Sequence, residues 1–180
     1  MRRHWVAAVS LVVLVACTET ETDSAQGVAD TTPRFAFEAT ATERADIVSA
    51  LQTLFDALET GDAELLRDVM DPDIVMHSSG TNAAGETSVS SSTLERLAAR
   101  IEASEVPLIE RMWDPLVSVN GSMAMIWAPY DFYSGAEFSH CGVDTATLMN
   151  TEEGWKMISL AWTRLQPPAC ALHPDGPPGS

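Results

Sequence analysis

Apolar residues recur every three or four positions over residues 42–61, a spacing that predicts an amphipathic helix with one buried face. Thr42 is expected to cap its N-terminus, because a threonine side chain accepts a hydrogen bond from a free backbone amide. Gly61 is expected to end the helix, because glycine readily adopts the left-handed conformation found there. The buried stripe is predicted to contain Ile47, Leu51, Leu54, Phe55 and Leu58.

Two shorter helices are predicted from the same kind of signal. Asp62 is a suitable cap for a second helix, which Pro72 is expected to end because proline has no amide hydrogen to donate. Ser92 or Thr93 is expected to cap a third helix. The third helix turns one apolar face inward, formed by Leu94, Leu97 and Ile101.

The segment between the second and third helices has a different composition. Residues 74–76 are apolar and favour a short strand that leads to His77. Residues 78–92 are mostly Ser, Gly, Ala, Thr and Asn, with few side chains that could be buried. This composition predicts a long loop, and such loops often border a functional site.

The second half of the chain is typical of β-structure. Residues 107–119 predict a strand with a kink at Asp114-Pro115, and Asn120-Gly121 is the strongest hairpin turn in the sequence. Three further strands are predicted up to Arg164, separated by turns at Ser134-Gly135 and at residues 150–154. Three helices followed by a run of hairpins indicate an α+β fold, with the helices packed on one face of a curved antiparallel sheet.

Over residues 42–164 the sequence resembles the nuclear transport factor 2-like superfamily, which includes the SnoaL-type cyclases and the ketosteroid isomerases. The features that carry the resemblance are the first helix running into Gly61-Asp62, the segment Asp73-Ile74-Val75, and Gly154-Trp155-Lys156-Met157-Ile158 in the last hairpin. The stretch from Tyr130 to Asp144 is similar to that of bacterial secreted members. The resemblance implies a cone in which the curved sheet and the long first helix enclose an apolar cavity.

The N-terminus resembles a bacterial lipoprotein signal. Arg2-Arg3-His4 gives a positive start, and the apolar run that follows is shorter than the roughly 20 residues needed to span a bilayer. The run ends in Leu14-Val15-Ala16-Cys17, which resembles the lipobox, the motif whose cysteine becomes lipidated. We therefore expect Cys17 to carry the lipid that anchors the protein to the outside of the bacterial membrane. The alternative is that the run forms a buried core element.

These signals divide the chain into four parts. Residues 1–16 are the expected signal peptide, and residues 17–41 are polar enough to form a flexible tether. Residues 42–166 form the expected folded domain, and residues 167–180 form a Pro- and Gly-rich tail. We expect little order in that tail beyond Cys170.

The charge of the chain excludes one class of partner. The net charge is -16 and the calculated isoelectric point is near 4.3. Nucleic acid is not an expected partner, because phosphate binding requires clustered Lys and Arg side chains. The acidity is otherwise explained by solubility.

The cysteines leave one question open. After lipidation of Cys17, Cys141 and Cys170 remain, and both are expected outside the cytoplasm, where disulfides persist. Counting along the last hairpin places Cys141 opposite Thr163 or Arg164, so the tail would have to turn back for a bridge to form. A disulfide and a free buried thiol are both compatible with the sequence.

Candidate chemistry lies on the strand predicted over residues 138–149. Side chains alternate across a strand, so His140 and Asp144 share a face and Cys141 lies on the other. A histidine beside a carboxylate can act as a general base, and the Tyr130 hydroxyl could stabilise an enolate. The alternative is that His140, Asp144 and Tyr130 form a buried hydrogen-bonded group that orders the sheet.

The other candidates would line the cavity around this group. Trp127 would reach it only if Pro129 introduced a bulge into the strand. No metal site or cofactor is expected, because neither a set of correctly spaced ligands nor a Gly-rich phosphate loop is present. The predicted ligand-binding side chains are Phe55, His77, Trp113, Trp127, Phe132 and Trp162.

Three functions are compatible with these features. The first is a lipid-anchored envelope protein that binds a small apolar ligand in its cavity. The second is an enzyme that moves a proton next to a carbonyl with His140 and Asp144, as the resemblance to isomerases implies. The third is a homodimer formed through the outer face of the sheet, with Val143, Thr145 and Thr147 in the interface.

Overall fold

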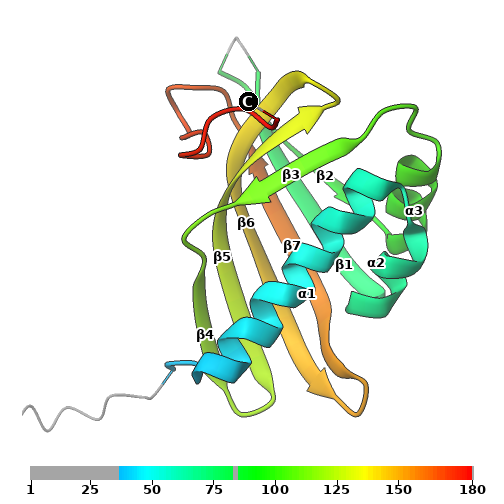
Figure 1. The fold of residues 1–180 in the computed structure, drawn as a ribbon, viewed down its shortest axis with the longest axis vertical. Helices are drawn as coiled ribbons and strands as arrows, with labels where there is room; N and C mark the ends of the chain where they lie inside the picture. The colour runs from blue at the N-terminus through cyan, green and yellow to red at the C-terminus, as the bar shows by residue number, and fades with distance from the viewer. Residues whose placement is uncertain (1–36, 83–84, 180) are drawn as a thin grey trace, which may run out of the picture. The chain divides into compact units, whose positions relative to one another are not determined.

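The computed structural model describes residues 37–82 and 85–179. Its helices are α1 (Ala41–Thr60), α2 (Ala63–Val69) and α3 (Leu94–Glu102). Figure 1 shows α1 crossing one face of the sheet, with α2 and α3 beside it. The strands are β1 (Met70–Thr81), β2 (Thr87–Ser92), β3 (Leu108–Met112), β4 (Leu116–Asn120), β5 (Met123–Ser134), β6 (Glu137–Thr151) and β7 (Gly154–Arg164).

The strands form one sheet in the order β2-β1-β7-β6-β5-β3, with β4 also paired to β5. All neighbours are antiparallel except β1 and β7, which are parallel with Met76 opposite Leu160. The predicted fold, a curved antiparallel sheet packed on three helices, is therefore confirmed, with this one parallel junction in addition. Consecutive hairpins build the rest of the sheet, whereas β1 meets β7 from a distant part of the chain, and no turn forces the two to run in opposite directions.

Local signals fix both ends of α1. Its N-cap is Thr40, whose side chain accepts from the Glu43 amide, while the Glu43 carboxylate accepts from the Thr40 amide. The predicted cap at Thr42 was two residues late, because the capping box requires a Glu or Gln three residues after the cap. At the other end Gly61 has φ +72, as predicted for a glycine cap.

The serine-rich segment after β1 is a hairpin rather than the predicted long loop. β1 continues to Thr81 and pairs with β2, with Ser78 opposite Ser90 and their hydroxyl oxygens 2.8 Å apart. Backbone hydrogen bonds form the ladder, so a strand with exposed side chains needs no apolar residues. The apolar pattern could not reveal β2 for that reason.

The kinked strand predicted over residues 107–119 is present as two strands. β3 and β4 both pair with β5, and Asp114 lies between them with φ 45, a conformation that ends the first strand. The hairpin predicted at Asn120-Gly121 is confirmed, and Gly121 has φ 60. The core lies between the helices and the concave face of the sheet, and its largest fully buried apolar side chains include Phe55, Ile47, Leu51, Met76, Ile126 and Met157.

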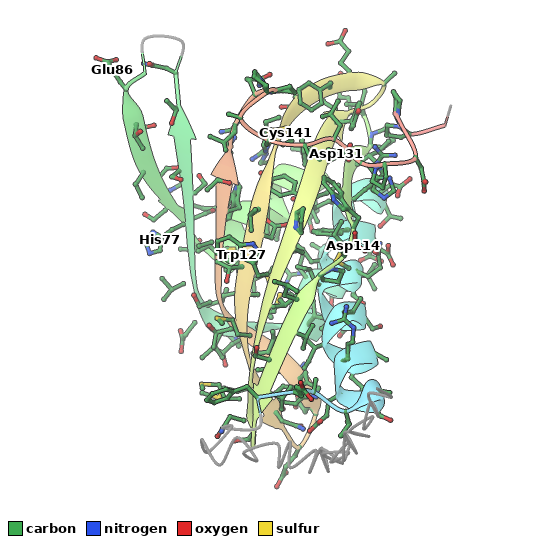
Figure 2. The ribbon with its side chains drawn as sticks, turned by 90° about the vertical axis from the view of Figure 1, so that its left-hand side faces the viewer. His77, Glu86, Asp114, Trp127, Asp131 and Cys141 are labelled. Carbon is green, nitrogen blue, oxygen red and sulfur yellow. A yellow bond between two sulfur atoms is a disulfide. The ribbon has the colours of Figure 1, made fainter. Side chains whose placement is uncertain are left out.

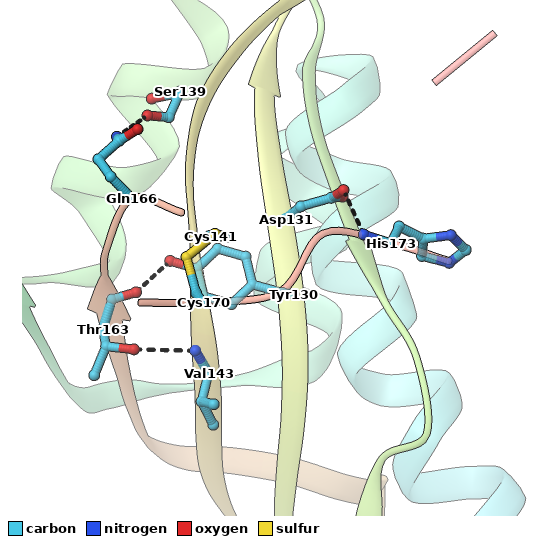
Figure 3. The surroundings of a disulfide bond; sticks show 9 residues. All are labelled: Tyr130, Asp131, Ser139, Cys141, Val143, Thr163, Gln166, Cys170 and His173. Atoms are coloured by element: carbon cyan, nitrogen blue, oxygen red, sulfur yellow. Dashed lines mark hydrogen bonds between the residues drawn. A yellow bond between two sulfur atoms is a disulfide. The ribbon is translucent and has the colours of Figure 1, made fainter. Parts of the chain in front are cut away.

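The tail folds back on the domain and is joined to it by a disulfide between Cys141 and Cys170 (Figure 3). Before the bridge, Leu165, the residue after β7, exchanges two backbone hydrogen bonds with Cys141 of β6. Beyond it, the His173 amide donates to Asp131, and the His173 ring packs edge-on against Trp113. The expectation of little order after Cys170 is therefore wrong, because a covalent bond and a buried acceptor hold the tail.

Candidate functional site

A cavity of about 380 Å³ lies between the concave face of the sheet and the helices α1 and α3. Leu54 and Leu58 of α1 form part of its apolar wall, together with Leu160 of β7. Four of the residues predicted from the sequence line it: Phe132, His140, Asp144 and Trp162. His140 and Asp144 face the same side of β6 because two pleats separate them.

Five of the predicted site residues do not line this cavity. Phe55 is buried in the core one position from Leu54, and Trp113 contacts the tail. His77 and Trp127 are exposed on the outer face of the sheet, as Figure 2 shows for His77 on β1. β1 turns Met76 and Ser78 inward instead, and β5 has no bulge at Pro129 that would turn Trp127 inward.

The fifth of these residues, Tyr130, has a structural contact. Its hydroxyl donates to the Thr163 carbonyl at 2.7 Å, and its ring is almost fully buried (Figure 3). Burial raises the pKa of Tyr130 far above its usual value, so the hydroxyl stays protonated. The predicted role in stabilising an enolate does not fit a hydroxyl that already spans two strands.

His140 and Asp144 do not form the expected catalytic pair. Within the described part of the chain no hydrogen bond joins them, and His140 Nδ1 lies 2.9 Å from the Ser139 hydroxyl. The imidazole stacks on Phe132 with ring centroids 4.9 Å apart. Burial, together with the nearby charges of Arg164 and Arg100, lowers the pKa of His140 to about 4, so the ring is neutral near pH 7.

Asp144 instead pairs with Glu110 of β3. The two carboxyl groups share a hydrogen bond inside the cavity, which requires one of them to be protonated. Burial is the main cause that raises the pKa of Glu110, and the Asp144 carboxylate adds to it. Burial also raises the pKa of Asp144, to about 7. Glu110 therefore holds the proton and donates to Asp144.

One oxygen of this carboxyl pair lacks an N–H or hydroxyl donor among the described residues. Asp144 is 4% exposed, and its buried Oδ2 accepts no hydrogen bond from any N–H or hydroxyl group that the structure describes. A buried acceptor without such a donor costs about 1–3 kcal/mol, so such atoms call for an explanation. Asp144 lines the cavity, so its carboxyl group is placed to contact a bound molecule.

Sequence reasoning missed Glu110 because the pairing that places it is non-local. Glu110 lies opposite Phe132 in the β3–β5 ladder, and Phe132 lies opposite His140 in the β5–β6 ladder. The only local signal was a charged residue within the strand Leu108–Met112. The cavity is also more polar than the predicted apolar hollow, because its lining includes Ser78, Ser90, Ser91, Ser92, Arg96, Arg100 and Arg164.

The match to known families agrees with this architecture. The family model described as "Putative lumazine-binding" matches residues 42–163, which is more than half of the chain. The chain belongs to this family. The matched region starts inside α1 and ends within β7, so it includes all the strands and every element that lines the cavity.

Solved structures confirm the nuclear transport factor 2-like fold predicted from the sequence. An NTF2-like protein of unknown function from Shewanella baltica is 16% identical, with a TM-score of 0.52 over 69% of this chain and 96% of that one. An NTF2-like superfamily protein from Salmonella enterica is 12% identical, with a TM-score of 0.57 over 72% and 96%. These identities show the fold alone. No curated protein matches the chain.

The N-terminal predictions lie outside the described residues. Cys17 and the apolar run before it are among them, as is most of the predicted tether. Residues 37–38 at the end of the tether pair with β4. Within the described ranges, none of the helices has the length and apolar character required to cross a bilayer.

Proposed function

We propose that this protein binds a small heteroaromatic molecule in the cavity between α1, α3 and the sheet. The observation that carries the proposal is the Glu110–Asp144 carboxyl pair, which lines the cavity and lacks N–H and hydroxyl donors at Asp144 Oδ2 among the described residues. A volume of about 380 Å³ falls in the ordinary range of small-molecule sites. Phe132 and Trp162 supply aromatic surface for a flat ring.

The carboxyl pair defines what part of a ligand would face it. The Asp144 carboxylate accepts hydrogen bonds, and the neutral Glu110 carboxyl group has a carbonyl oxygen that also accepts one. A ring N–H group is the natural partner for such acceptors. The description of the family as lumazine-binding supports the choice, because lumazine is a flat bicyclic ring with N–H groups on its edge.

Lumazine is therefore the first probe to test. We expect it to bind the wild type and to bind Asp144→Asn at least about tenfold more weakly, measured by isothermal titration calorimetry. The Asn carbonyl would accept from Glu110 and leave its NH₂ group facing the ring N–H, so that two donors meet. Asp46→Asn, an exposed substitution on α1, is the matched control and should leave binding unchanged. Equal affinity for all three proteins would contradict the proposal.

The same substitution should change how stability depends on pH. The pKa of Asp144 is raised from 3.8 to about 7, so the folded chain keeps a proton that the unfolded chain releases between these values. Stability conferred by that proton is lost as pH rises through this window. Asp144→Asn cannot ionise, so it should match the wild type near pH 4 and exceed it by about 1–3 kcal/mol at pH 8. Urea denaturation at the two pH values measures the difference.

His140 changes stability with pH in the opposite direction from Asp144, but it does not affect the comparison of the two proteins. The pKa of His140 is lowered to about 4, so the unfolded chain binds its proton first as pH falls, and stability decreases below pH 6.5. Both proteins contain His140, so its effect cancels in their difference. A difference that is the same at pH 4 and at pH 8 would contradict the raised pKa of Asp144.

We further propose that Cys17 is lipidated and anchors the domain at the bacterial cell envelope. The support is the positive start, the short apolar run and the Leu14-Val15-Ala16-Cys17 motif. The Cys141–Cys170 disulfide agrees with a location outside the cytoplasm. Cys17→Ala should move the protein from the membrane fraction to the soluble fraction, whereas an unchanged distribution would refute lipidation.

A homodimer through the outer face of the sheet stays a prediction. Apolar side chains on that face are about half exposed, among them Trp127 at 50% and Met125 at 52%. Val143, Thr145 and Thr147 lie beside them on β6 and are half-buried. Sedimentation of the wild type and of Trp127→Lys would test it, because a charge at the centre of this face should prevent association.

A further inference from the structure

The positively charged side chains of the described chain fall into two groups. Those in the first group each donate to a carboxylate or to a backbone carbonyl. Those in the second, Arg96, Arg100 and Arg164, form neither an ion pair nor a side-chain hydrogen bond with any described residue, and all three line the cavity. The first group contains Arg44, Arg67, Arg111 and Lys156.

These three arginines come from two elements that line the cavity. Arg96 and Arg100 lie one turn apart on α3, and Arg164 is the last residue of β7. The charges of Arg100 and Arg164 both act on the buried His140 ring, so their field reaches the interior. Serine hydroxyls in the same cavity lining, such as those of Ser78 and Ser90, add neutral hydrogen-bonding groups.

The charge of the cavity contrasts with that of the whole chain. Near neutral pH the three guanidinium groups carry +3, the Glu110–Asp144 pair carries at most -1, and neutral His140 carries none, which leaves at least +2. The whole chain has a net charge of -16. The chain has 26 acidic residues that could form ion pairs with arginines. Three arginines around one cavity nevertheless have no ion-pair partner among the described residues, so the cavity has a positive potential.

We propose that the ligand of this cavity is an aromatic anion, whose carboxylate or phosphate group binds Arg96, Arg100 and Arg164 while its ring lies against Phe132 and Trp162. Guanidinium groups bind both anions through paired, charge-assisted hydrogen bonds, so the two share one recognition chemistry. The inference rests on the proposed function, because it assumes that the cavity takes a ring. It adds the charge of the ligand and the residues that select it.

The test compares two molecules of the same shape. 2-Naphthoate and 2-naphthamide differ in charge but hardly in size, so their ratio of dissociation constants isolates the contribution of the anion. We expect the wild type to bind the carboxylate at least about tenfold more tightly at low salt, by calorimetry, and the preference to shrink as salt rises. Arg100→Gln should lose most of it. Arg67→Gln, which removes the same charge from α2 outside the cavity, should retain it.

Further measurements separate the ways in which the inference could fail. Equal binding of the two naphthalenes would overturn the anion and leave ring binding intact. Binding of neither naphthalene, together with no binding of lumazine, would overturn both proposals. Inorganic phosphate and 1-naphthyl phosphate distinguish a free anion from an anion on a ring. If inorganic phosphate alone binds as tightly as the ester, the claim that one site recognises ring and anion together is wrong.

Discussion

Gly142→Ala should destabilise the domain by about 3–5 kcal/mol, because no space exists for a methyl group at this position. A Cβ atom there would overlap the Thr163 carbonyl of β7 and lie 2.6 Å from the Thr163 side-chain oxygen. Both oxygens are already used, since the carbonyl accepts from Tyr130 and the side chain accepts from the Val143 amide at 3.0 Å (Figure 3). The backbone would have to move and weaken both hydrogen bonds.

Gly80→Ala is the matched control for this prediction. Gly80 lies in β1, and a Cβ atom there would meet nothing closer than Arg164 atoms at 3.9 Å. Its substitution should change stability by less than about 1 kcal/mol. Urea midpoints of the two variants, taken with the slopes of their transitions, measure the contrast. Equal midpoints would show that β6 and β7 can separate at no cost, contrary to the packing seen.

Arg111→Met should lower the free energy of unfolding by about 3–5 kcal/mol, as much as Gly142→Ala, but for an electrostatic reason. Asp131 is 0% exposed, and its two carboxylate oxygens accept from Arg111 at 3.0 and 2.7 Å. Without the guanidinium group this buried charge would keep only the His173 amide as a donor. Removing one partner of a buried ion pair leaves the other uncompensated.

The double variant Arg111→Met/Asp131→Asn separates charge from packing. The Asp131→Asn substitution leaves a neutral amide side chain that could still accept from the tail amide, so most of the stability lost in the Arg111→Met variant should return. Thermal and urea denaturation of the wild type, both single variants and the double variant complete the cycle. If the losses simply add, the cost comes from packing of the long Arg111 side chain and the electrostatic explanation is wrong.

The sequence predicted features that depend on residues close together in the chain. The stripe from Ile47 to Leu58 predicted α1, and Gly61 and Gly121 marked the turns that follow their elements. The two-residue alternation placed His140 and Asp144 on one face, and both line the cavity. These signals succeed because helix period, strand period and glycine conformation are properties of neighbouring residues.

Where the sequence failed, backbone pairing and distant contacts were responsible. The serine-rich β2 has no apolar pattern, because its ladder with β1 is formed by backbone groups that every residue carries. The Cys141–Cys170 disulfide can form only because the tail turns back onto the domain. The disulfide itself and the hydrogen bond from the tail to the buried Asp131 hold the tail there. The sequence placed His77 and Trp127 on the wrong face of the sheet. β1 turns the neighbours of His77, Met76 and Ser78, toward the cavity, and β5 has no bulge at Pro129 that would turn Trp127 inward.

The sequence by itself determined the helices, most of the strands, their order and the side of β6 on which chemistry could occur. Only the tertiary structure decided which groups meet there, because strand pairing brings Glu110 to Asp144, and the packing of α3 against the sheet brings Arg100 and Arg164 to the same cavity from elements far apart in the chain. The physical reason is that the pKa of a buried carboxyl and the potential of a cavity depend on distances in space, and separation along the chain does not fix those distances.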